Sequence, residues 1–136
     1  MIRRSLLALG AIVSAFFLFA AFAAGDYSSE IATAQAHAKL AVQAKDLNLI
    51  HVHLKHVINC LVGPDGKEFF ADTINPCEHS GHGAIPDLGH ASPQVLAKLE
   101  MAVTAAEKGV KTNKPDPAHT AARRTATLLK QASKLE

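Results

Sequence analysis

The sequence has little net charge, few aromatic side chains and only two cysteines. Its formal net charge of +2 at pH 7 excludes a strongly basic nucleic-acid-binding protein. Glycine and proline number only 8 and 6 of 136 residues, which excludes a collagen-like chain. The apolar share of 49% excludes a disordered acidic or basic tail. We therefore expect one folded domain.

Familiar catalytic signatures are also missing. The sequence has no pattern typical of a Ser-His-Asp triad, a phosphate-binding P-loop or a dinucleotide-binding fold. It lacks a Cys-x-x-Cys-His motif, which excludes covalent c-type haem, and a Glu-x-x-His pair, which disfavours a ferritin-like di-iron site. We therefore expect a protein that is not an enzyme.

The first 23 residues have the pattern of a secretory signal peptide. Two arginines precede an apolar run from Leu6 to Phe22, and small residues up to Ala23 form the expected cleavage site. An uncleaved anchor helix is the alternative, although a run of 17 residues is at the short limit for a membrane span. We expect a periplasmic or secreted protein, free of the membrane after cleavage, with a single helical domain over residues 24–136.

Histidine is the residue that the sequence has in excess. All eight histidines follow the expected cleavage site, whereas two of the 14 lysines and arginines precede it. The mature chain would then carry 12 basic and 12 acidic residues. We therefore expect an exported domain that is neutral overall and rich in imidazole.

Helical periodicity accounts for most of this domain. Apolar residues recur every three or four positions in four segments. The predicted helices cover about 29–45, 47–62, 93–109 and 117–134. This pattern predicts an all-α fold, a small antiparallel four-helix bundle made of two helical hairpins.

Start and stop signals set the predicted helix ends. Asp46 lies in a predicted tight turn between the first two helices, although one continuous helix over 29–62 is the alternative. Gly109 is taken as the stop of the third helix, and Asp116 precedes a proline as the expected start of the fourth.

A long segment rich in glycine and proline, over residues 63–92, joins the two hairpins. Thirty residues without regular structure are unusual in a small domain unless they are tied down or functional. Because an exported protein folds in an oxidising compartment, Cys60 and Cys77 are expected to form a disulfide. This bond would anchor the segment and contribute on the order of 3 kcal/mol.

The densest chemical signal lies in the second predicted helix. At about 100° per residue, His53, His56 and Cys60 form a stripe beside the apolar face, whereas His51 lies on the opposite flank. If the first hairpin turns near residues 46 and 47, His37 lies level with His56 across the pair. We therefore expect imidazoles from both helices to meet.

The disulfide would also lay the loop over this stripe and add two more histidines to it. The candidate metal ligands are therefore His37, His53, His56, His79 and His82. Convergent imidazoles bind borderline divalent metals such as copper, nickel or zinc. Since neutral imidazole is the ligand, binding would weaken below about pH 6.

Three other interpretations stay open at this point. The anchored loop over 63–92 could bind a partner protein in the cell envelope, which makes the chain a non-enzymatic interaction module. Haem held by axial histidines would also suit a helical bundle. The histidine stripe could instead be purely structural.

The first predicted hairpin resembles the small metal-binding periplasmic proteins. The resemblance rests on the alanine-rich stretch 35–44, which contains His37, and on the three histidines that follow within residues 51–56. It implies an exported helical bundle that binds divalent metals, copper especially. The second half of this chain has only His119 on a predicted helix, so the resemblance implies one site on the first hairpin and not high-capacity storage.

Overall fold

The computed structural model describes residues 25–136, and the predicted signal peptide lies outside them. This part of the chain is all helical, with five helices and no strand, which confirms the all-α prediction. The helices are α1 (Tyr27–Gln43), α2 (Leu47–Val62), α3 (Ala84–Leu88), α4 (Pro93–Lys111) and α5 (Pro115–Ala132). Within residues 25–136, no helix is both long enough and apolar enough to cross a membrane.

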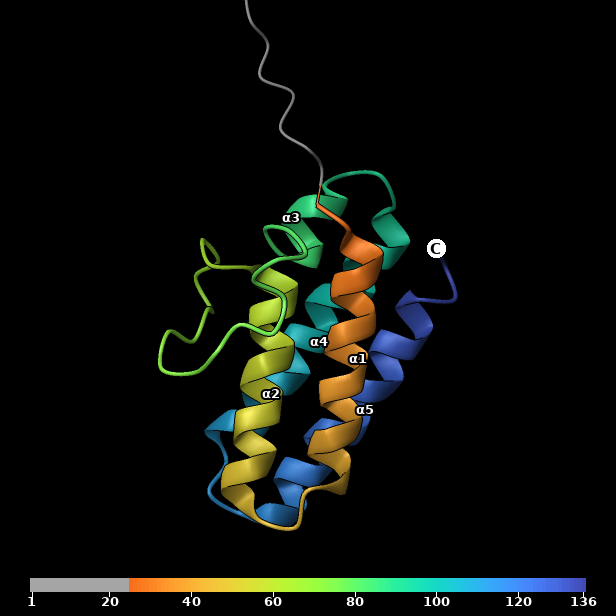
Figure 1. Ribbon diagram of the computed structural model, residues 1–136. Coiled ribbons are helices and arrows are strands. Elements are labelled where there is room, and N and C mark those ends of the chain that lie inside the picture. Colours follow the sequence, from red (N-terminus) through yellow and green to blue (C-terminus); the bar gives the residue numbers. More distant parts are fainter. Residues whose placement is uncertain (1–24) are drawn as a thin grey trace, which may run out of the picture.

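Four long helices pack around one shared core. Figure 1 shows α1 and α2 side by side with α4 and α5 behind them, while α3 and the green loop lie toward the end where α1 begins. Large branched side chains fill the core, and the α1 side of it is lined mostly by fully buried alanines. Because alanine adds little bulk, α1 can approach its neighbours closely. The largest fully buried apolar side chains are Ile31, Ile50, Leu54, Ile58, Leu61, Leu99 and Leu129.

A tight turn separates α1 from α2, so the two are not one continuous helix. The backbone becomes extended at Ala44, and Asp46 caps α2 by accepting a hydrogen bond from the Leu49 amide at 2.9 Å. Aspartate suits this position because its carboxylate satisfies an amide that has no partner within the helix. The turn therefore sets how residues of α1 lie against residues of α2.

The predicted stop at Gly109 is wrong, because α4 continues to Lys111. Gly109 is buried within the helix, and a Cβ atom there would lie 2.4 Å from Leu54 Cδ1 and 3.0 Å from Ala121 Cβ. Glycine is thus present because α4 packs closely against α2 and α5. Helix α5 also begins earlier than expected, at Pro115, since proline is tolerated throughout a first turn.

The connection over 63–92 is not wholly irregular. It contains α3, which is bracketed by Gly83 and Gly89 at φ values of 114° and 54°. Its buried residues Ala84 and Leu88 pack into the core. Five residues with a central proline carry too little periodicity for the sequence to indicate a helix.

The disulfide prediction is confirmed, and a buried asparagine holds the same loop. Cys60 and Cys77 are bonded and almost fully buried, with their Cα atoms 5.1 Å apart. Next to Cys60 in α2, the side-chain amide of Asn59 donates to the Phe70 carbonyl at 3.0 Å. The Asn59 carbonyl accepts from the Phe70 amide at 2.8 Å. The fully buried Asn59 side chain thus satisfies backbone hydrogen-bonding groups of the loop.

A second buried polar group, Glu30 of α1, joins this helix to the start of α3. Glu30 is fully buried, and its Oε1 accepts a hydrogen bond from the Gly83 amide at 2.9 Å. Burial raises the pKa of Glu30 to about 7; the nearby Asp87 carboxylate adds to the rise, while the Gly83 hydrogen bond and the charge of His82 oppose it. A proton on Glu30 therefore stabilises the fold.

We expect Asn59→Ala to lower the free energy of unfolding by at least about 2 kcal/mol. The backbone N–H and C=O groups of Phe70 would both lose the Asn59 side chain as their hydrogen-bond partner, and each unsatisfied buried group costs about 1–3 kcal/mol. Urea unfolding followed by circular dichroism measures this. The matched control is Asn48→Ala, at an exposed position of the same helix. Equal stability of the two variants would contradict the anchoring role of Asn59.

We expect Glu30→Gln to gain stability relative to the wild type as the pH rises. In the wild type, the contribution of the protonated Glu30 carboxyl to folding stability is complete below its unfolded pKa of 4.5. This contribution is lost as the pH rises through its folded pKa of about 7. Glutamine keeps the acceptor for Gly83 and offers an N–H beside Asp87 at every pH. The stability difference should grow by up to about 1.4 kcal/mol per pH unit across this window. Urea unfolding at pH 5, 6, 7 and 8 tests it, with Glu78→Gln as the same substitution at an exposed position.

Candidate metal centre

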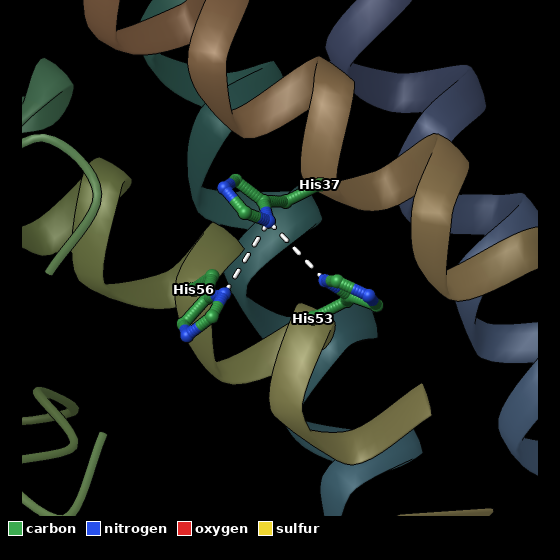
Figure 2. A group of neighbouring side chains, drawn as sticks. All are labelled: His37, His53 and His56. Atoms are coloured by element: carbon green, nitrogen blue, oxygen red, sulfur yellow. Dashed lines mark hydrogen bonds between the residues drawn. The ribbon is translucent and has the colours of Figure 1, made fainter. Parts of the chain in front are cut away.

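Three histidines from two helices meet between α1 and α2. His37 extends from α1, and His53 and His56 extend from successive turns of α2, as Figure 2 shows. The Nδ1 atom of His37 lies 3.3 Å from Nδ1 of His53 and 3.3 Å from Nδ1 of His56. The three ligand atoms all lie within 4.8 Å of one another. Among residues 25–136, this is the group of three or more ligand-type side chains that could hold a metal.

Hydrogen bonding alone does not account for the close approach of the three rings. A neutral imidazole nitrogen is either a donor or an acceptor, so Nδ1 of His37 makes one full hydrogen bond in the plane of its ring. It nevertheless has two nitrogen neighbours at the same distance. A metal ion accepts lone pairs from all three nitrogens at once. Two nitrogens bound at about 2.0–2.1 Å with tetrahedral geometry lie about 3.3 Å apart, which is the distance from His37 Nδ1 to each of the other two rings.

The surroundings favour the neutral form of all three rings. Burial lowers the pKa of His37, and the neighbouring His53 lowers it further. Burial also lowers the pKa of His53. The pKa of His56 falls to about 4 through burial and through repulsion from His37 and His53. Because a metal competes with protons for the same lone pairs, a lowered pKa favours the form that binds metal.

The group has a buried side and an open side. His56 is only 6% exposed, and its Nε2 lies 2.9 Å from the Thr73 hydroxyl on the loop that covers α2. His37 and His53 are half-buried at the surface of the bundle. Solvent can therefore reach the group from the side of His37 and His53 and not from the side of His56.

The two loop histidines do not belong to this group. His79 is exposed, and Nδ1 of His82 lies 3.2 Å from a carboxylate oxygen of Asp87. After Cys77 the loop runs to the first turn of α1, where the Asp26 amide donates to the Ser80 carbonyl. The disulfide thus brings residues 70–77 over the histidine stripe, but the residues that follow lie near the start of α1.

The remaining histidines lie apart from the three. Nε2 of His51 is 3.0 Å from the carbonyl of Thr112, which ends α4, so this ring joins α2 to the α4–α5 turn. His90 is exposed and His119 is half-buried. None of them belongs to the ligand group of the described residues.

Two residues outside the predicted ligands support the group. Thr73 contacts His56 through its hydroxyl, and Asn59 holds the loop that carries Thr73. The sequence carries a signal for Asn59, since a polar side chain three residues after His56 within an apolar helix needs hydrogen-bond partners when it is buried. Thr73 gave no signal, because nothing in a polar loop distinguishes one hydroxyl from another.

No protein-family model, curated protein or solved structure matches this chain. Its function must therefore be inferred from its own chemistry. Within the part that the structure describes, three imidazoles around one point are the feature that suggests a ligand.

Proposed function

We propose that this protein binds a divalent transition metal, copper, nickel or zinc, through His37, His53 and His56. The observation that carries the proposal is the position of His37 Nδ1, 3.3 Å from Nδ1 of both other rings. Three convergent nitrogen ligands with no carboxylate or thiolate among them favour these borderline metals over calcium or magnesium, which prefer oxygen.

Export forms part of the proposal. The basic start, the apolar run and the small residues before Ala23 support delivery to the periplasm or to the outside of the cell. The buried Cys60–Cys77 disulfide suits an oxidising compartment. The proposal also includes an antiparallel arrangement of the four long helices, which is supported by the tight turns near Ala44 and Thr112.

Geometry favours a bare metal ion over haem. The His37 ring centre lies 4.7 Å from that of His56 and 5.5 Å from that of His53, so the rings contact one another and leave no room for a macrocycle between them. The interaction-module hypothesis stays a prediction, and the observation in its favour is Ile74, an apolar side chain that is 70% exposed on the anchored loop.

We expect the purified, untagged protein to bind one metal ion per chain, and His37→Ala or His53→Ala to weaken binding at least about 100-fold, since losing a ligand costs more than losing a residue that supports one. Competition titration with Cu(II), Ni(II) and Zn(II) measures the affinity and the metal preference.

His90→Ala is the matched control, because this exposed ring lies outside the group and should leave affinity unchanged. Binding no tighter than that of free imidazole would end the proposal. Equal metal affinities of the His90→Ala and His37→Ala variants would show that the metal binds elsewhere.

Metal binding should persist to lower pH than the ordinary imidazole pKa of 6.5 implies. The pKa values of all three rings are lowered, that of His56 to about 4, so protons displace the metal only when the solution is more acidic. The affinity should therefore change little between pH 7.5 and 6.5 and fall only at lower pH. Zinc titrations at pH 7.5, 6.5, 5.5 and 4.5 measure this. A steep loss centred above pH 6.5 would contradict it.

A further inference from the structure

The same face of α2 carries two of the three proposed metal ligands and the residues that attach the loop. Lys55 forms an ion pair with Asp72, and its ammonium group lies 5.1 Å from the centre of the Phe70 ring. Asn59 bonds the Phe70 backbone, and Cys60 is joined to Cys77. These attachments are on both sides of Thr73 in the loop sequence. They hold Thr73 in place without any contribution from the histidines.

Thr73 occupies a position that matters for the chemistry of His56. A neutral imidazole that binds metal through Nδ1 must carry its proton on Nε2. That nitrogen lies 2.9 Å from Thr73 Oγ1, and the His56 ring is almost fully buried. An N–H group buried there without an acceptor would cost free energy. The threonine hydroxyl can accept this hydrogen bond and leave the Nδ1 lone pair directed at His37 and the metal.

The other two rings differ from His56 in this respect. Among residues 25–136, neither His37 nor His53 has a protein hydrogen-bond partner at Nε2, and both are half-buried, where solvent can reach them. His56 is therefore the ligand whose proton position depends on a protein group. Partners of this kind fix the orientation and basicity of metal-binding histidines.

We propose that Thr73 is a positioning residue for the metal centre: its hydroxyl accepts a hydrogen bond from the Nε2–H group of His56, which leaves the Nδ1 lone pair for the metal. This inference rests on the proposed function, because it concerns the same site. The loop over 63–83 is thereby given a role beyond covering the core, since it carries the group that selects one proton arrangement of a ligand.

The test is a competition titration with Zn(II) on the full mature chain and three variants. Thr73→Val removes the hydroxyl at almost constant shape and should weaken binding about 10- to 100-fold. Thr73→Ser keeps the hydroxyl and should bind within about threefold of the wild type. Thr104→Val, which makes the same change at an exposed position of α4, should also bind like the wild type. Circular dichroism of the metal-free variants compares their folds.

The outcomes separate the two proposals. A wild type that takes up none of Cu(II), Ni(II) and Zn(II) overturns the proposed function, whereas a wild type and a Thr73→Val variant of equal metal affinity overturn the role of Thr73 alone. A Thr73→Ser variant as weak as Thr73→Val also overturns that role. Imidazole ¹⁵N shifts of the zinc-loaded wild type test it without any substitution: we expect the metal on Nδ1 and the proton on Nε2 of His56, and the reverse assignment would overturn it.

Discussion

The register of α1 against α2 is the constraint on which the rest of the structure depends. The chain turns within a few residues around Asp46, whose carboxylate caps α2. Since each helix is rigid, this turn determines which residues lie level farther along the pair. His37, about two turns before it, comes to lie opposite His53 and His56. A shift of one residue would rotate these rings by about 100° and separate them.

Polar groups then join the remaining parts of the fold to α1 and α2. Asn59 bonds the loop backbone, Glu30 bonds the start of α3, and the half-buried ring of His51 lies against the Thr112 carbonyl at the end of α4. Asn59 and Glu30 are fully buried and costly to bury without a partner, so each favours one arrangement of the chain over its competitors. With few aromatic side chains available to fill a core, the fold combines small apolar residues with such directional contacts.

Structural and chemical roles overlap on α2, because this helix contacts the core, the loop and α1 at once. Its apolar residues face the core, its cysteine and asparagine hold the loop, and two of its histidines point at α1. These faces are adjacent on one cylinder, so the loop that closes the core also lies beside His56. When the loop attaches to α2, it therefore also fixes the surroundings of the His56 ring. That coupling makes a loop hydroxyl relevant to a site between two helices.

The sequence by itself determined the helical periodicity and the shared stripe of His53 and His56, which follow from spacings along one chain segment and from fixed helix geometry. It also determined the pairing of Cys60 with Cys77, since the chain has two cysteines. It left open whether the first two helices are one, and the structure decided this with the turn before Asp46. Only the tertiary structure decided that His79 and His82 lie away from the group, that Gly109 is a packing residue and that Thr73 meets His56. Such contacts depend on the path of a loop and on the close approach of separate helices, for which the residues concerned carry no periodic signal.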